Sequence, residues 1–556
     1  MPAGIPCATD KTVWMFWHDW SDAPDIARKS VESWTIRNPD WDVRPLCWSS
    51  VGDWLDAEVI ARIRSLDICI QHQTDLLRLE LLFRHGGVWA DATSFCAWPL
   101  SDWLPDCLRQ GFFAFRRDII QTPQRPIANW FLAASAGSDL LAQLRVKVWA
   151  YWEQRARTGD YFWFHGVFAN ALTTDAGFAV AWEKVPAISC MHPFHAGPNS
   201  PALPQKPTEA HLRLLADPPA PVYKLTHKMG TVCGPESLLH RIVQETITPF
   251  RRHPVHPRIV LHVGLPKCAS TTLQVWAHEN RDMLRAHGVC YPQPSPGTGV
   301  PKHQELVRAF LQSRFQAAEA RVAPVPEPVL FLSTEGFSNH FYDLERNPWA
   351  AVRMRALFRG SRLSLLMITR EKDAWARSYH QQQIVNPPNP RYLHGSSLQF
   401  DDFLQQDRVR RLYNWEKLAV DLQEFYGAET IVQTSVEGDW QRVVTEHLGI
   451  PHMLDSLKNF PRQNLGLTRH ATELLRQANA FGIETGRNIF IRLLSHIDRH
   501  LDAGKDVPPF AGFLGKQEET QAIAQLVSRL QATDGNARRT LDAMRHLIGQ
   551  IERIPE

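Results

Sequence analysis

The sequence has 556 residues, which is too long for one ordinary hydrophobic core, so we expect two large domains. Hydrophobic residues make up 44% of the sequence and charged residues 21%, a balance that is typical of folded globular proteins and excludes a largely disordered chain. The formal net charge of +3 is too small for the basic field of a nucleic-acid-binding protein, so we expect no nucleic-acid partner.

The sequence also argues against a membrane-spanning or exported protein. It contains no run of about 18 apolar residues, and no basic segment followed by a signal-type apolar stretch at its start. We therefore expect a cytoplasmic protein without a transmembrane segment, and we leave open its oligomeric state and peripheral association with the inner membrane. The nine cysteines form no C-x-x-C pairs, which argues against a disulfide framework or a zinc site.

The first half alternates short apolar runs with helical patterns. Residues 12–18 (TVWMFWH) predict a strand, residues 75–85 a helix that ends at Gly86 and Gly87, and residues 87–91 a second strand. This alternation is typical of α/β proteins, in which crossover helices connect the strands of a largely parallel sheet. The same alternation recurs in the second half, so we predict an α/β fold for both.

Three polar residues of the stretch QTDLLRLELLFRHGGVWADAT (73–93) are predicted to converge. Asp75 and Arg78 lie three residues apart near the start of the predicted helix and share one of its faces. The glycine turn then brings Asp91 to the end of the second strand. Taken alone, the Asp75 and Arg78 pair would be a helix-surface salt bridge worth about 0.2–0.5 kcal/mol.

This stretch resembles the sugar transferases of the GT-A fold that carry a D-x-D motif, and more closely the capsular polysaccharide synthesis proteins among them. The opening VWMFWHDWSDAPDIARKSVESWTIRNPDWDV also looks like the first strand and helix of that family, and the resemblance covers about residues 10–235. It implies a GT-A-like, Rossmann-like glycosyltransferase domain. Such a domain takes a nucleotide-sugar donor and a glycan or polysaccharide acceptor, as in a bacterial cell-surface polysaccharide pathway.

The resemblance also implies roles for particular residues. Trp17, at the end of the first strand, would stack on the nucleotide base, while Asp75 and Arg78 would contact the sugar and the ribose. Asp91 would bind Mn²⁺ or Mg²⁺ bridging the diphosphate, because these hard cations prefer carboxylate and phosphate oxygens.

The sequence departs from the D-x-D motif at its second aspartate, where Thr93 stands, so the metal would have one carboxylate and a hydroxyl. His227 is a further candidate ligand, although a lone histidine is more often structural. Lys224 or Lys228 would contact the diphosphate.

A second α/β domain is predicted after a proline cluster. The cluster at residues 250–257 separates a domain of residues 1–250 from one of residues 257–556. Four apolar runs in the second domain predict strands, namely residues 259–265, 329–335, 363–369 and 430–435.

The first of these strands leads into PKCASTT, a candidate anion-binding loop. The helix after it is entered through Ser270, Thr271 and Thr272, and the unpaired N–H groups of its first turn attract negative charge. Lys267 adds a full positive charge. The lysine does not follow a second glycine as in a Walker A motif, which disfavours a nucleoside triphosphatase.

A similar design recurs at LSLLMITREKDAWARSYHQQQ. A strand ends at Arg370, and the helix after it carries Ser378 eight residues later. An arginine can bind phosphate oxygens bidentately while a hydroxyl completes the contact. Taken alone, this arginine would be read as an ordinary salt bridge at the start of a helix.

Together the two loops resemble the motifs of sulfotransferases that use 3′-phosphoadenosine 5′-phosphosulfate (PAPS), over about residues 257–480. The resemblance implies a P-loop-type parallel sheet, with Lys267 and the Ser270–Thr272 turn at the 5′-phosphosulfate and Arg370 and Ser378 at the 3′-phosphate. Ala269 stands where the family usually has glycine. If this position has a positive φ, alanine costs on the order of 1 kcal/mol.

Sulfuryl transfer to a hydroxyl needs a base and a positive charge at the leaving group. Enzymes of this kind use a glutamate or a histidine as base, which makes Glu335, at the end of the strand 329–335, the candidate and His340 the alternate. Lys267 would neutralise the bridging oxygen. Glu335 as a partner of a helix N-terminus is the competing interpretation. Arg462 and Asn464 would close over the donor.

We therefore predict a bifunctional enzyme in which fusion raises the local concentration of a shared glycan. Two alternatives stay open. The first half is a glycan-binding module that presents the acceptor, or the second half is a P-loop kinase that acts on a small molecule.

Overall fold

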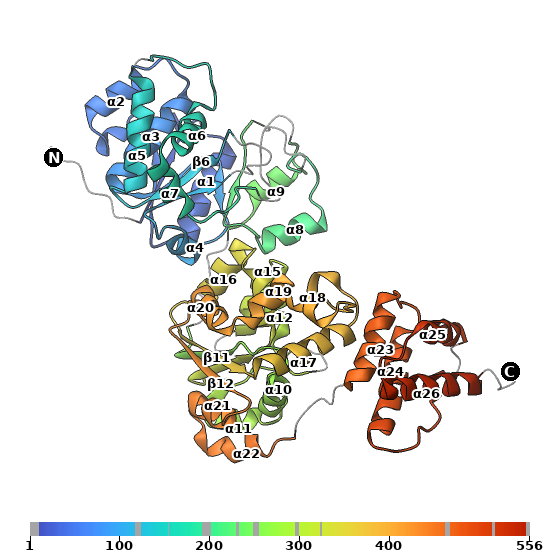
Figure 1. Cartoon of the computed structure of the whole chain (residues 1–556). Coiled ribbons are helices and arrows are strands. Elements are labelled where there is room, and N and C mark those ends of the chain that lie inside the picture. Colours follow the sequence, from blue (N-terminus) through green and yellow to red (C-terminus); the bar gives the residue numbers. More distant parts are fainter. Residues whose placement is uncertain are drawn as a thin grey trace. The chain divides into compact units, whose positions relative to one another are not determined.

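The computed structural model describes residues 11–116, 124–153, 155–191, 202–228, 233–247, 255–294, 300–322, 325–461, 467–513 and 517–551 (Figure 1). The chain divides into two compact units. The first comprises Met1–Val255, Arg308–Pro324 and Asp343–Gly360, and the second comprises His256–Val307, Val325–Tyr342 and Ser361–Glu556. The first unit thus contains two segments from beyond residue 300. The two activity domains expected at 1–250 and 257–556 stay predictions.

The first unit is built on a mixed five-stranded sheet. Its order is β2 (Asp42–Leu46), β1 (Thr12–Phe16), β3 (Gly87–Ala90), β6 (Ile127–Ala134) and β5 (Phe112–Arg116). β1 pairs in parallel with β2 and β3, whereas β6 is antiparallel to both β3 and β5. The α/β class is confirmed, but a largely parallel sheet is wrong here. The chain from Arg116 to Ile127 is too short for a parallel crossover, which needs a dozen or more residues.

The glycine turn of the first unit has the expected form. Helix α3 (Ile70–His85) ends at Gly86, and Gly86 and Gly87 have φ of 67° and 90°. A Cβ on Gly87 would lie 2.4 Å from the carbonyl oxygen of Thr12, so glycine allows β3 to start directly beside β1. A separate two-stranded antiparallel sheet joins β4 (Ser94–Cys96) to β7 (Val222–Lys224).

The remaining elements of the first unit are helices. They are α1 (Asp25–Arg37), α2 (Ala57–Arg64), α4 (Leu100–Cys107), α5 (Asp139–Trp152), α6 (Trp163–Thr174), α7 (Ala176–Glu183), α8 (Glu209–Ala216), α9 (Leu238–Gln244), α13 (Phe315–Glu319) and α16 (Pro348–Phe358). Helices α12 (Gln304–Leu311) and α15 (Phe341–Leu344) each contain residues of both units.

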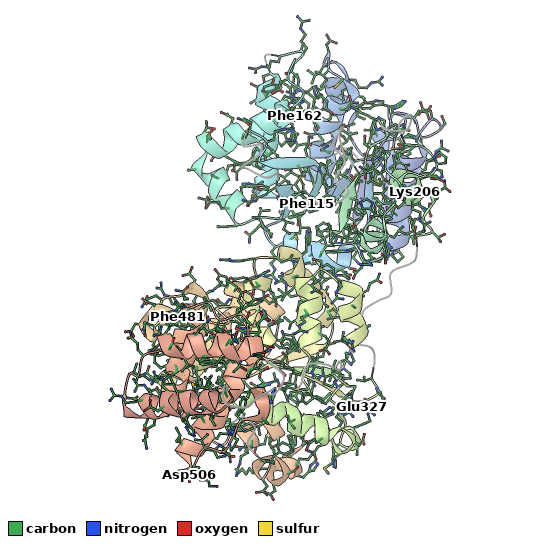
Figure 2. The ribbon with its side chains drawn as sticks, turned by 90° about the vertical axis from the view of Figure 1, so that its right-hand side faces the viewer. Phe115, Phe162, Lys206, Glu327, Phe481 and Asp506 are labelled. Atoms are coloured by element: carbon green, nitrogen blue, oxygen red, sulfur yellow. The ribbon has the colours of Figure 1, made fainter. Side chains whose placement is uncertain are left out.

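A distant segment of the chain completes the core of the first unit. Trp349 of α16 packs edge-on against Trp103, with ring centroids 5.7 Å apart, and Arg353 pairs with the buried Asp102 at 3.2 Å. Phe115 of β5, labelled in Figure 2, is buried in the same aromatic cluster. These contacts join residues about 250 positions apart, so the compact unit includes residues far beyond the proline cluster.

The second unit contains a parallel five-stranded sheet. Its order is β12 (Thr430–Ser435), β11 (Arg362–Thr369), β8 (Arg258–His262), β10 (Val329–Ser333) and β9 (Val289–Cys290). Every pair is parallel, as expected from the sequence, and the four predicted strands are present as β8, β10, β11 and β12. The chain leaves β8 towards β9 and leaves β11 towards β12 on the opposite side. The carboxyl ends of β8 and β11 therefore flank a topological switch point, where ligands of open α/β sheets bind.

Helices follow and cover these strands. They are α10 (Ser270–Glu279), α11 (Arg281–Ala286), α14 (Gly336–Asn339), α17 (Lys372–Val385), α18 (Phe400–Leu404), α19 (Asp407–Tyr413), α20 (Trp415–Tyr426), α21 (Trp440–Leu448) and α22 (Leu454–Lys458). The helix that was expected after the PKCASTT loop is interrupted at Asn280 and becomes α10 and α11. Short 3₁₀ turns occur at Val51–Asp53, Ala320–Val322, Pro390–Tyr392, Pro451–Met453 and Ala511–Phe513.

The last part of the second unit is helical. It consists of α23 (Arg469–Ala480), α24 (Arg487–Asp502), α25 (Gln517–Arg529) and α26 (Gly535–Ile551), which share one hydrophobic core (Figure 1). Ile384 of α17 belongs to that core and ties the bundle to the sheet of the unit. Among the helices that the structure describes, none has the length and apolar composition required to cross a bilayer.

Candidate functional site

The first candidate site is an ionic cluster at the carboxyl end of β3. Arg78 lies between two carboxylates, with Nη1 3.0 Å from Asp75 Oδ1 and Nη2 3.2 Å from Asp91 Oδ1. Lys224 Nζ lies 2.8 Å from the other oxygen of Asp91. The structure thus brings together the three polar residues expected to converge, and it adds Lys224.

Burial distinguishes this cluster from a surface salt bridge. Asp75 and Arg78 are 5% and 4% exposed, so the interpretation of the pair as a helix-surface salt bridge is wrong. Arg78 also lies over the ring of Trp89, 5.1 Å from its centroid. The side-chain amide of Asn129 donates to Asp75 Oδ1 at 2.7 Å. The sequence offered no signal for Asn129, because it comes from the antiparallel strand β6.

The two carboxyl groups have different proton affinities. Burial raises the pKa of Asp75 to about 7, against the opposing positive charge of Arg78. Burial also acts to raise the pKa of Asp91. There the charges of Lys224 and Arg78, with hydrogen bonds from Lys224 and Trp89, outweigh burial and hold the pKa below its ordinary value. Asp91 is therefore the stable anion of the cluster.

Backbone pairing holds Lys224 in place. In the β4–β7 ladder Lys224 lies opposite Ser94, and the N–H of Leu225 donates to the carbonyl of Thr93 at 2.9 Å. Lys224 Nζ also donates to Thr93 Oγ1 at 3.0 Å. Of the two lysines considered from the sequence, Lys224 reaches Asp91, whereas the side chain of Lys228 is exposed.

The contacts of Asp91 do not fit the divalent cation expected there. Both carboxylate oxygens already accept from cationic donors, Oδ1 from Arg78 and Oδ2 from Lys224. Two positive unit charges 4 Å apart repel each other by about 4 kcal/mol at an effective dielectric constant of 20. A divalent cation at that distance from the charge of Lys224 or Arg78 would be repelled about twice as strongly. Among the described residues, no group of three or more His, Cys, Asp or Glu side chains is arranged to hold a metal ion.

Trp17 lies beside the same turn. It follows β1 directly, and its ring packs against a small cluster of alanines that includes Ala92, the neighbour of Asp91. The ring of His227 meets it edge-on, with centroids 5.2 Å apart. Trp17 is therefore placed next to the ionic cluster, and its role as a platform for the base stays a prediction.

The second candidate site lies at the carboxyl ends of three neighbouring strands. Lys267 follows β8, Glu335 follows β10 and Arg370 follows β11, and β8 lies between the other two strands. Burial lowers the pKa of Lys267, the positive charge of Arg370 lowers it further, and Glu335 opposes both. The three charged groups expected to act together therefore lie within electrostatic reach of one another.

The loop after β8 has an unusual backbone. Lys267 and Ala269 have φ of 67° and 58°, so the condition considered for Ala269, a positive φ, is met. This conformation costs alanine about 1 kcal/mol relative to glycine. Ala269 is also the N-cap of α10, and no side chain caps that helix, which leaves the first-turn N–H groups uncovered by a capping side chain.

The hydroxyl residues of this loop differ from one another. Ser270 is buried and its Oγ donates to the carbonyl of Leu265 at 3.3 Å, so it contributes to the shape of the loop. Thr271 and Thr272 are half-buried in the first turn of α10. Their contact with a donor phosphosulfate stays a prediction.

The second motif is attached to the first by a hydrogen bond. Trp375 Nε1 donates to the carbonyl of Pro266 at 2.9 Å, which joins α17 to the loop that carries Lys267. Arg370 precedes α17, and Ser378 lies half-buried on that helix. The carboxylate of Glu371 accepts hydrogen bonds from two N–H groups in the first turn of α17. Because these N–H groups are occupied, an anion bound there would be held by side chains.

Glu335 is the N-cap residue of the short helix α14, but its side chain makes no capping hydrogen bond to that helix. Instead its Oε2 accepts from Gln274 Nε2 at 3.3 Å and lies 3.5 Å from Lys302 Nζ. The side chain of Glu335 is 17% exposed, whereas Gln274 is fully buried. Gln274 and Lys302 were missed from the sequence. A polar residue in the apolar pattern of α10 was the only signal for Gln274.

A buried polar network lies behind Glu335. Gln274 also donates to Ser333 Oγ at 3.2 Å, and this hydroxyl lies 2.7 Å from Nδ1 of the fully buried His262. Burial lowers the pKa of His262 to about 4, so this ring is neutral at pH 7. His340, the alternate base, follows the opposite end of α14, where its ring contacts Tyr392.

Two expected donor contacts lie outside the described residues. Arg462 and Asn464 belong to the segment 462–466, so their closure over the donor stays a prediction.

Comparisons with known proteins concern the N-terminal region. Residues 6–233 match the family described as "Capsular polysaccharide synthesis protein". Similar curated proteins are an O-glycosyltransferase, braB, from Annulohypoxylon truncatum, 33% identical over 102 residues, and the O-glycosyltransferase PaGT from Phomopsis amygdali, 25% identical over 151 residues. These alignments cover 16% and 24% of this chain. The N-terminal region therefore has glycosyltransferase relatives.

The coverage of these relatives is partial. The aligned part spans 24% of the length of braB and 37% of that of PaGT. Among solved structures, "PaToxG Glycosyltransferase" aligns with 32% of this chain and 74% of its own, at 15% identity and a TM-score of 0.22, which is too low for any inference.

Proposed function

We propose that the chain is a bifunctional glycan-modifying enzyme. Its first domain, residues 1–250, transfers a sugar from a nucleotide-sugar donor to a glycan or polysaccharide acceptor. Its second domain, residues 257–556, transfers a sulfuryl group from PAPS to a hydroxyl of the same or a neighbouring glycan. Fusion of the two domains raises the local concentration of the shared intermediate.

Two observations support the sugar-transfer step. Residues 6–233 match the capsular polysaccharide synthesis family, and the buried cluster of Asp75, Arg78 and Asp91 lies beside Trp17. In this proposal Trp17 stacks on the nucleotide base, and Asp75 and Arg78 contact the sugar and the ribose. A buried, hydrogen-bonded ionic cluster keeps its geometry without a ligand, as a transferase site requires.

The convergence of three charged residues after adjacent parallel strands supports the sulfuryl-transfer step. Lys267 binds the bridging oxygen of the phosphosulfate, and Arg370 with Ser378 binds the 3′-phosphate. Glu335 takes the proton of the acceptor hydroxyl while the new O–S bond forms and the bond from sulfur to the phosphate oxygen breaks. The products are a sulfated glycan and adenosine 3′,5′-bisphosphate.

Transfer from a nucleotide sugar separates this proposal from a first domain that only binds glycans. The purified chain is screened against nucleotide sugars by thermal shift, with PAPS as the positive control, and hydrolysis of each stabilising donor is followed. We expect hydrolysis by the wild-type chain and loss of it in Asp91→Ala. Glycan binding without stabilisation by any nucleotide sugar would favour the binding module.

Nucleotide selectivity tests the second domain. We expect adenosine 3′,5′-bisphosphate to bind and ATP not to bind, and we expect Arg370→Ala to weaken the bisphosphate by at least about tenfold. Arg362→Ala is the matched control, because Arg362 is exposed at the opposite end of the same strand, β11. Tight binding of ATP that survives Arg370→Ala would identify a kinase instead.

A further inference from the structure

The ammonium group of Lys224 lies between the two side chains that stand in the D-x-D positions. Lys224 Nζ is 2.8 Å from Asp91 Oδ2 and 3.0 Å from Thr93 Oγ1. In a site with two aspartates, a divalent cation bridges these positions and the diphosphate. Here a covalently attached cation contacts both of them.

The position of this ammonium group is set by the fold. Lys224 and Asp91 are 133 residues apart in the sequence, but β4 and β7 form an antiparallel ladder that places Lys224 opposite Ser94. The hydrogen bond from the N–H of Leu225 to the carbonyl of Thr93 extends the pairing of the two strands by one residue. The side chain of Lys224 is 19% exposed, so it is held against the turn and still reaches solvent.

Arg78 supports the same arrangement from the buried side. Its guanidinium pairs with Asp91 Oδ1, so the two oxygens of one carboxylate hold two cations in defined positions. The replacement of the second aspartate by Thr93 belongs to this pattern. It removes the negative charge that would hold a divalent ion and supplies a neutral acceptor for the lysine.

We propose that Lys224 takes the place of the divalent metal and that this site binds the diphosphate of a nucleotide without a metal ion. The inference rests on the proposed sugar-transfer function and specifies its donor site. A diphosphate is the ligand that fits, because the partly exposed ammonium of Lys224 presents a fixed positive charge at the turn beside Trp17, while the buried Arg78 holds Asp91 from the other side. Asp91 is then an orienting residue for both cations rather than a metal ligand.

Binding of UDP and GDP to the purified full-length chain tests this assignment by calorimetry, once with EDTA and once with Mn²⁺. We expect at least one of the two to bind in EDTA with a Kd within about twofold of the value in Mn²⁺. Lys224→Ala should weaken that binding at least about tenfold. Lys206→Ala is the matched control, because Lys206, labelled in Figure 2, is exposed and pairs with the exposed Glu236 at 3.3 Å.

A double variant tests the replacement directly. Lys224→Ala combined with Thr93→Asp removes the ammonium and restores the second carboxylate, so we expect nucleotide binding that requires Mn²⁺. Wild-type binding that EDTA abolishes would overturn this inference and leave the proposed function intact. Absence of UDP and GDP binding in both conditions would overturn this inference, while the proposed sugar transfer is decided by the screen of nucleotide sugars. The wild-type comparison decides the matter even if a variant fails to fold.

Discussion

Replacement of Arg78 by methionine is predicted to destabilise the first unit strongly. The change keeps the apolar length of the side chain but removes a 4%-exposed guanidinium that pairs with Asp75 and Asp91. Breaking a buried ion pair by removing one partner costs about 3–5 kcal/mol, and here Asp75 and Asp91 lose the guanidinium that they share, although Asp91 keeps Lys224. For a unit of this size, that corresponds to a decrease in melting temperature of roughly 10 °C.

Thermal unfolding of the full-length chain, followed by calorimetry, measures this effect. Arg213→Met is the matched control, because Arg213 forms an ion pair with Glu209 in which both side chains are more than 70% exposed. We expect the control to change the melting temperature by no more than about 1–2 °C. A decrease of less than about 3 °C in Arg78→Met would refute the view that the cluster is a buried ionic structure.

The remaining predictions concern pH, the glycine turn and the second site. Burial raises the pKa of Asp75 to about 7, so between about pH 4 and pH 7 the folded chain holds a proton that the unfolded chain has released. The stability of the first unit should therefore fall as the pH rises towards 7. Asp75→Asn should remove this pH dependence of the melting temperature. Gly87→Ala should lower the melting temperature by several degrees, because its Cβ would lie 2.4 Å from a backbone oxygen; an unchanged transition would contradict this. Gln274→Leu should lower kcat for sulfuryl transfer about tenfold without changing the Kd of adenosine 3′,5′-bisphosphate, since it removes a hydrogen bond to Glu335; equal loss of both would indicate a collapsed site. Ala269→Gly should leave stability unchanged or raise it by up to about 1 kcal/mol, and a clear loss would show that the alanine side chain is needed.

The parts of this protein that follow from neighbouring residues were predicted from the sequence. Strands β8, β10, β11 and β12 correspond to apolar runs bounded by turn residues, and the glycine pair ends α3 at the expected place. The resemblance to the sulfotransferase motifs implied that Lys267 and Arg370 act on one donor. Both follow neighbouring strands, and the carboxyl ends of parallel strands meet at one edge of a sheet. These features depend on local backbone preferences and on the alternation of apolar and polar residues.

Tertiary structure decided which distant residues meet. The pairing of β4 with β7 brings Lys224 to Asp91, and the packing of α10 against the end of β10 brings Gln274 to Glu335. The return of α16 to α4 gives Asp102 its cationic partner. Strand register and helix packing depend on the summed burial and hydrogen bonding of many residues. No local run of residues encodes that sum, so the motif around Asp91 could not show that a lysine 133 positions away pairs with its carboxylate.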